Sequence, residues 1–190
     1  MTFEDARAQF PVLERYAYLQ AGSVGPLSRA TLEAMVADEE RSLHEGRASA
    51  ARFERVLALR EEIRPELAEL VGVEAAQVSI TASTTDGCNI VLAGLDLGPE
   101  DEVITTTDEH FGLIGPLHAS GARVVVSPPD PDRIVASVTP RTRLLALSHV
   151  LWTTGQVLPV HELKAQTGLP ILVDGAQSVG TIPVDARGLD

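Results

Sequence analysis

The stretch from Ile171 to Gly180, ILVDGAQSVG, places a carboxylate at the end of an apolar run. A carboxylate on a buried strand is costly unless a positive group meets it. For Asp174 that group could be an arginine, a metal ion or a protonated ring nitrogen. No cluster of further metal ligands supports the metal. Asp-Gly is also a common turn, so a purely structural role is the plain alternative.

The stretch from Thr81 to Asn89, TASTTDGCN, carries hydroxyl side chains where a helix is expected to begin. The first N–H groups of a helix point outward, and the helix dipole favours an anion there. The hydroxyls of Thr84 and Thr85 could therefore help to bind a phosphate. Ordinary N-capping by Ser83 or Thr84 explains the same residues equally well. The segment contains neither a G-x-G-x-x-G fingerprint nor a P-loop motif.

Ring-bearing side chains occur in two further segments, TTTDEHF and SHVLWTTGQ. His110 could stack on a planar ring or move protons near neutral pH, whereas a histidine in a loop is more often simply solvated. Trp152, the one tryptophan, could form the wall of a pocket, although packing in the core is the commoner role. For His149, directly after an apolar run, a structural role is expected.

Five short apolar runs must position these groups, and they lie at 78–81, 102–105, 122–127, 143–148 and 170–174. Continuous apolar runs joined by helical crossovers predict a parallel sheet covered on both faces, which is a doubly wound α/β domain. Ligands of such sheets bind beyond the carboxyl ends of the strands. The candidate residues follow four of these runs, so we expect them at one edge of the sheet.

The residues before the first run are mostly helical in pattern. We expect a helix from about Ser28 to Glu45 and another that begins near Ser49. Pro65 is expected to start a new turn and Gly72 to stop the helix. No internal repeat or long linker interrupts the chain.

The composition narrows the function classes. The net charge of −12 argues against a nucleic-acid surface. No apolar run reaches the length of a membrane span, and the N-terminus lacks the apolar core of a secretory signal, so we expect a cytoplasmic protein that does not enter membranes. The single cysteine, Cys88, excludes an internal disulfide framework.

In order along the chain, these motifs resemble those of the pyridoxal-phosphate enzymes of fold type I, in the class V aminotransferase branch that includes the cysteine desulfurases. The motifs that carry the resemblance are YLQAGSVGPLS, ITASTTDGCN, TTDEHFGL, LSHVLWTTGQVLPV and ILVDGAQSVGTIPVD. It spans nearly the whole chain. It implies a three-layer αβα large domain with a mostly parallel sheet, with pyridoxal 5'-phosphate as cofactor and an amino acid as substrate.

The resemblance also implies roles for single residues. Asp174 would pair with the protonated pyridinium nitrogen, so that the ring can accept electrons from a substrate carbanion. Gln177 would donate to the phenolic oxygen of the ring. His110 would stack on its face and could transfer protons. Thr84 and Thr85 would hold the phosphate.

The sequence departs from the family pattern at two of these segments. Ser83 stands where many relatives have a glycine, and Trp152 stands near the place of an asparagine in cysteine desulfurases. The second difference lowers the expectation of a desulfurase and leaves a transaminase, a lyase or an epimerase open. Cys88 lies in the helix after the phosphate loop, where a small core residue is expected.

The lysine that forms a Schiff base with the cofactor is expected beyond this chain. The one lysine, Lys164, lies in a helical stretch where a solvated role is expected. We therefore expect the N-terminal half of a longer homodimeric enzyme, inactive alone. Residues 1–45 would form an N-terminal arm and helix that contribute to a small domain, and 46–190 the first part of the large domain. A non-catalytic module that binds a phosphate ligand or a partner chain is the alternative.

The resemblance carries one further implication, for the strand order. The run at 78–81 would not neighbour the run that ends at Asp174, because two later strands of the family lie between them. A gap of three strand spacings, about 14 Å, would then remain in the sheet.

Overall fold

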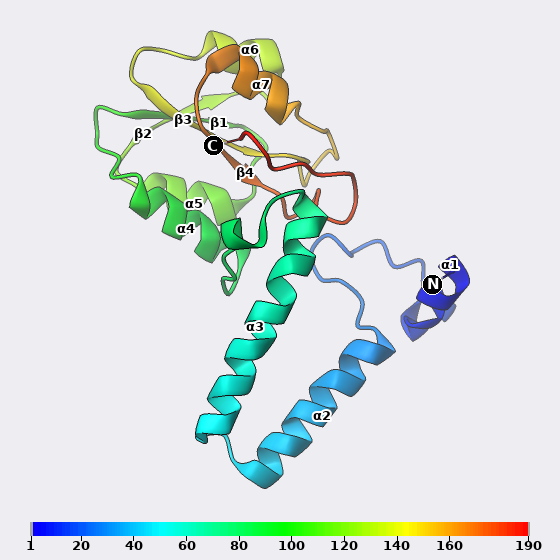
Figure 1. Ribbon diagram of the computed structural model, residues 1–190. Helices are drawn as coiled ribbons and strands as arrows, with labels where there is room; N and C mark the ends of the chain where they lie inside the picture. Colours follow the sequence, from blue (N-terminus) through cyan, green and yellow to red (C-terminus); the bar gives the residue numbers. More distant parts are fainter. Residues whose placement is uncertain (1, 190) are drawn as a thin grey trace. The chain divides into compact units, whose positions relative to one another are not determined.

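The structure is a computed structural model that describes residues 2–189 (Figure 1). Two compact units divide between Ile63 and Arg64, inside the long helix α3 (Ala50–Val71). Each unit is described by itself. The division expected from the sequence, between 1–45 and 46–190, concerns family roles and stays a prediction.

The first unit is helical. Its elements are α1 (Phe3–Ala8), the 3-10 turn η1 (Pro11–Glu14), α2 (Arg29–Glu45) and the first part of α3. The Ser28 hydroxyl caps α2 by accepting the Thr31 N–H, and Gly46 ends the helix at a φ of 78°. Only glycine adopts such a backbone without strain. The helix predicted from about Ser28 to Glu45 is therefore confirmed.

The expectation for Pro65 is wrong, because α3 runs through this residue without a break. A proline inside a helix removes one hydrogen bond and crowds the preceding turn. Good helix formers on both sides, such as Glu61 and Leu67, offset that cost over a helix of 22 residues. The helix stops before Gly72, whose φ is 76°, as predicted.

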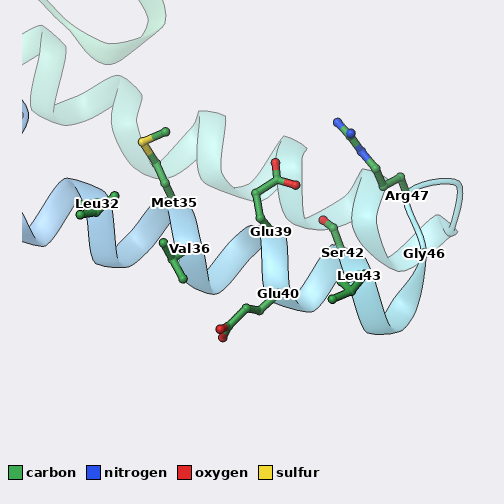
Figure 2. A pocket seen from close by; sticks show the side chains of 9 residues that line it. All are labelled: Leu32, Met35, Val36, Glu39, Glu40, Ser42, Leu43, Gly46 and Arg47. Atoms are coloured by element: carbon green, nitrogen blue, oxygen red, sulfur yellow. The ribbon is translucent and has the colours of Figure 1, made fainter.

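An apolar groove runs along α2 (Figure 2). Its apolar side chains are half-exposed or more, with Leu32 at 49%, Met35 at 55% and Leu43 at 79% of their full exposure. The groove is lined by Leu32, Met35, Val36, Glu39, Glu40, Ser42, Leu43, Gly46 and Arg47. In the described residues of this unit, α2 thus presents apolar surface that the unit itself does not cover.

The second unit is a three-layer αβα domain, as predicted (Figure 1). Its strands are all parallel, in the order β2-β1-β3-β4. Helices α4 and α5 cover one face of the sheet, and α6 and α7 cover the other. The bounds are η2 (Ala75–Gln77), α4 (Thr84–Gly94), β1 (Glu102–Thr106), α5 (Phe111–Ala119), β2 (Arg123–Ser127), α6 (Pro131–Ala136), β3 (Thr142–Ser148), α7 (Val160–Thr167) and β4 (Ile171–Asp174).

The strand predicted at 78–81 is the one strand prediction that is wrong. In the described part of the chain this segment joins no strand, whereas the other four runs form β1 to β4. A strand exists only where a neighbouring backbone completes its ladder. The run at 78–81 has the composition of a strand but pairs with neither β2 nor β4, the two outermost strands of the sheet. The place of this segment in the strand order that the resemblance implies stays a prediction.

The core of this unit consists of two apolar clusters, one on each side of the sheet. One joins the sheet to α6 and α7 through Ile104, Ile134, Leu145, Leu147, Leu151, Leu158, Leu163 and Ile171. The other joins it to α4 and α5 through Cys88, Leu92, Val103, Leu113, Leu117, Leu144 and Ala146. These clusters hold the strand ends in place. No helix within residues 2–189 has the length and apolar character that a membrane span requires.

Candidate functional site

The carboxyl ends of β1, β3 and β4 lie at one edge of the sheet because the strands are parallel. Ser148, the last residue of β3, stands opposite Asp174, the last residue of β4. The segment that contains His110 follows β1 directly. Helix α4 packs against both α5 and β4. Its first turn, with Thr84 and Thr85, lies next to the start of α5, as the contacts of Gly112 below show.

Asp174 is a buried carboxylate, with 5% of its surface exposed. Its Oδ1 atom accepts the Ala176 N–H at 2.9 Å, so the residue does form the expected turn. Its negative charge also acts on the neighbouring groups. It raises the pKa of the Cys88 thiol and of the Glu109 carboxyl. Asp174 therefore holds a turn and makes this edge electrically negative at the same time.

Cys88 is the small core residue that the sequence predicts, with 4% exposure. Its pKa is raised to about 11, first by burial and then by the charge of Asp174. A thiol with so high a pKa stays protonated at neutral pH and is a poor nucleophile. Cys88 thus contributes packing to this side of the sheet.

The first turn of α4 shows which residue caps the helix. Ser83 is the N-cap, and its hydroxyl accepts the Asp86 N–H at 3.1 Å. Asp86 in turn accepts the Ala82 N–H at 3.1 Å. The cap is thus formed by Ser83, and Thr84 and Thr85 follow it as exposed residues of the first turn. Their position suits an anion at the helix start.

His110 is the N-cap of α5 and is only half-buried. Its Nδ1 atom accepts the Gly112 N–H at 3.0 Å, so this arrangement assigns the ring proton to Nε2. The rings of His110 and Trp152 form a T-shaped pair, with a centroid distance of 5.2 Å and an interplanar angle of 89°. Phe111 lies 3.8 Å away on the same measure. The ring is therefore oriented by contacts, in contrast to the solvated histidine expected from the sequence.

Trp152 lies at the surface of this edge, with 50% exposure. This exposure contradicts the commoner expectation of a core tryptophan, and the alternative of a pocket wall stays a prediction. The backbone N–H of His149 donates to the Asp174 carbonyl at 3.0 Å, and the residue is half-buried, while the structural role expected of its side chain stays a prediction. Burial, and secondarily the charge of His161, lowers the pKa of His149.

Gly112 joins the threonines to the histidine. A Cβ atom at Gly112 would lie 2.7 Å from the Thr85 Oγ1 atom and 3.0 Å from the His110 Nδ1 atom. Such separations are too short for ordinary contacts. The starts of α4 and α5 can therefore approach each other this closely only because residue 112 has no side chain.

Two further residues from the sequence analysis lie at different places. Gln177 is half-buried in the turn that follows β4, three residues after Asp174. Lys164 is half-buried on α7, which covers the opposite face of the sheet from α4 and α5 (Figure 1). The one lysine of the chain is therefore on the other side of the sheet from the threonines.

Glu109 is a residue of this edge that the sequence analysis did not single out. Its side chain is 8% exposed, and its carboxyl accepts hydrogen bonds from Thr106 and Ser148. Burial raises its pKa, and the charge of Asp174 raises it further, while these hydrogen bonds lower it. An acid between a strand end and His110 was the available signal, of the same kind as the acid that ends ILVD.

Comparison with known proteins shows the family. Residues 18–190 match the family described as Aminotransferase class-V. A probable cysteine desulfurase of Methanothermobacter thermautotrophicus is 30% identical over 100% of this chain and 50% of its own length. The isopenicillin N epimerase of Streptomyces clavuligerus is 30% identical over 96% of this chain and 50% of its own.

A solved structure agrees with these matches. It is a C-DES variant with glycine covalently linked to the PLP cofactor, with a TM-score of 0.87 and 35% identity over 94% of this chain and 51% of that one. The chain spans about half the length of the curated relatives that it matches. On the family match over residues 18–190 and the relative that is 30% identical over the whole chain, the chain belongs to the class-V aminotransferase family.

Proposed function

We propose that this edge of the sheet binds pyridoxal 5'-phosphate and that the chain forms part of an enzyme acting on an amino acid. The observation that carries the proposal is the placement of a buried carboxylate, Asp174, at the edge where two helix starts meet. The residues fit the cofactor chemically. A buried anion suits a protonated ring nitrogen, and a helix start with exposed hydroxyls suits a phosphate.

The family resemblance suggests a role for each residue, and the positions of the residues support these roles. Asp174 would keep the ring nitrogen of the cofactor protonated by its charge, and Thr84 and Thr85 would donate to the phosphate. His110 would stack on the cofactor ring and can hold a proton at Nε2, because its Nδ1 atom accepts the Gly112 N–H. Gln177 would donate to the phenolic oxygen. When bound, the cofactor supplies an electron sink for bonds at the amino-acid α-carbon.

The proposal extends to the class of substrate and to no single reaction. The relatives include proteins named as a cysteine desulfurase, an epimerase and a cystine C–S lyase. A transaminase, a lyase or an epimerase therefore remains the proposed activity. Because Lys164 lies on α7, we propose that the covalently bound lysine comes from outside these residues and that the chain alone is inactive.

The proposed assembly is a homodimer, and its partner surface includes the apolar groove of α2. The family resemblance implies the dimer. The exposed Met35 and Leu43 support a surface that a second copy covers (Figure 2).

Trp152 provides the test, because it is the only tryptophan and contacts His110. Pyridoxal phosphate absorbs light where tryptophan emits, so binding at this edge should quench the fluorescence in a saturable way. Asp174→Asn removes the charge and keeps an oxygen for the Ala176 N–H. We expect it to weaken binding about tenfold or more, as for loss of a charge-assisted hydrogen bond. Trp152→Phe, titrated in parallel, reports the background signal.

A second measurement tests the assignment of the lysine. Borohydride reduction of the chain with pyridoxal phosphate, followed by peptide mass spectrometry, should leave Lys164 unmodified. Lys164→Arg should bind the cofactor as tightly as the natural chain. Absence of saturable quenching, or equal affinity of the Asp174→Asn variant, would overturn the proposed cofactor site. A stoichiometric adduct at Lys164 would overturn only the proposal that the covalently bound lysine comes from outside these residues.

A further inference from the structure

The Glu109 carboxyl group lies between the ends of two neighbouring strands. Its Oε1 atom accepts the Thr106 hydroxyl of β1 at 2.7 Å. Its Oε2 atom accepts the Ser148 N–H of β3 at 2.9 Å and also the Ser148 hydroxyl. All three residues are buried, with exposures of 8%, 1% and 4% in the order Glu109, Thr106 and Ser148. The carboxyl group thus connects β1 to β3 through bonds between buried residues.

The bond from the Ser148 N–H continues the pairing of β1 with β3 beyond the last residue of β1. In the sheet this donor would bond to a backbone carbonyl of a neighbouring strand. Strand β1 ends at Thr106, and the Glu109 side chain supplies the acceptor instead. A donor buried at this point would otherwise be left unsatisfied.

The two residues that follow this connection are both candidates for contact with the cofactor. His110 is the next residue after Glu109. Asp174 stands opposite Ser148 in the sheet, and its carbonyl accepts the His149 N–H at 3.0 Å. The Glu109 carboxyl group is therefore hydrogen-bonded to Ser148, which stands opposite Asp174 in the sheet. Glu109 is also joined by a peptide bond to His110.

We propose that Glu109 is a positioning residue that sets the separation between His110 and Asp174 by joining the ends of β1 and β3. The proposal rests on the proposed function for the roles of His110 and Asp174 as cofactor contacts. Glu109 itself does not touch the cofactor. Its effect is transmitted through Ser148 on one side and through the peptide bond to His110 on the other.

The charge of this region supports the assignment. Burial raises the pKa of Glu109, and the nearby negative charge of Asp174 raises it further. The connection itself is made by three hydrogen bonds, which do not require a negative charge at position 109. This leads to a specific expectation for glutamine, whose oxygen can accept from Ser148 while its amide donates to the Thr106 oxygen.

The variants separate shape from charge. Glu109→Ala removes the connection, and Glu109→Gln should restore it. Thr106→Val is a milder variant that removes one of the three hydrogen bonds with almost no change of volume. Glu102→Ala is the matched control, because Glu102 is a buried carboxylate at the opposite end of the same strand, with 2% exposure.

The first readout needs no cofactor. It is the ratio of the amide hydrogen-exchange rates of Ser148 and Leu145, measured by NMR. The Leu145 N–H of the same strand bonds to the Pro170 carbonyl, so the ratio cancels changes in global stability. We expect Glu109→Ala to raise the ratio about 100-fold and Thr106→Val about fivefold, whereas Glu109→Gln and Glu102→Ala stay within about threefold.

The second readout is the quenching of Trp152 by pyridoxal phosphate. Glu109→Ala should weaken binding about tenfold, with Glu109→Gln and Glu102→Ala within about threefold of the natural chain. An unchanged exchange ratio in Glu109→Ala would overturn the proposal, and so would unchanged affinity in a chain that binds. If the natural chain does not bind, the proposed function fails, while the exchange ratio still decides whether Glu109 makes the connection.

Discussion

Gly112 determines how closely the residues of the site approach one another. It is buried at the start of α5, between the Thr85 hydroxyl and the His110 ring. The backbone at Gly112 does not require glycine for its dihedral angles, since its φ is not positive. The requirement is one of space, because Thr85 and His110 already occupy the volume of a Cβ atom.

We expect Gly112→Ala to destabilise the chain by about 1 kcal/mol, since the added methyl group forces the Thr85 side chain or α5 to move. Urea denaturation measures the change. Gly94→Ala is the control, because Gly94 is the last residue of α4 and no atom lies within 4 Å of the added Cβ atom. It should be neutral or stabilise by up to about 1 kcal/mol. Equal effects of the two substitutions would contradict the crowding at Gly112.

At the scale of the element, strand β1 has a buried carboxyl group near each end. Glu102 is its first residue, and Glu109 follows its last residue by three positions. Glu102 accepts from the Thr139 hydroxyl and from Arg141, with Nη2 at 2.8 Å, and Arg123 completes the group at 3.3 Å. These contacts, with the Thr139 hydrogen bond first, lower the pKa of Glu102. Glu109 has the opposite shift, because burial raises its pKa more than the hydrogen bonds from Ser148 and Thr106 lower it.

The shift at Glu102 predicts a pH dependence of stability. A carboxyl whose pKa is lower in the folded state stabilises the fold above its unfolded pKa. This contribution is lost as the pH falls through the folded value. Glu102→Gln should therefore lower the urea midpoint at pH 7 and narrow its difference from the natural chain toward strongly acidic pH. A constant difference over that range would show that the charge of Glu102 is not the cause.

At the scale of the whole molecule, the exposed apolar surface of α2 is the feature that the first unit leaves uncovered (Figure 2). Apolar surface of this extent on a folded protein commonly marks an interface. The glutamates that line the groove, Glu39 and Glu40, give it a polar border, as at the rim of protein interfaces.

Analytical ultracentrifugation tests the proposed homodimer. The chain should sediment at twice its own mass, and Leu43→Glu should shift it toward the monomer by placing a charge in the groove. Leu19→Glu is the control, since Leu19 is 91% exposed and does not line the groove. A monomeric natural chain, or a dimer unaffected by Leu43→Glu, would contradict the proposed interface.

Much of the fold could be predicted because its signals are local. The Ser28 cap and Gly46 limit α2, and the apolar runs at 102–105 and 143–148 are buried strands. The run at 78–81 has the same composition but forms no strand, because a strand depends on a neighbour that composition does not reveal. The prediction for Pro65 was wrong because the other residues of the long helix α3 offset the free-energy cost of the proline.

Only part of the candidate site could likewise be predicted from the sequence. The sequence by itself determined that Asp174 ends a buried strand, that Thr84 and Thr85 begin a helix and that the family is the class-V aminotransferases. These properties depend on residue type and on neighbours along the chain.

Only the tertiary structure decided that the rings of Trp152 and His110 form a T-shaped pair and that Glu109 joins Thr106 to Ser148. The bond between Glu109 and Ser148 spans 39 positions of the chain. Such contacts form only after the parallel strands have been brought into register. The polar groups are then buried, and burial both strengthens their hydrogen bonds and shifts their pKa values.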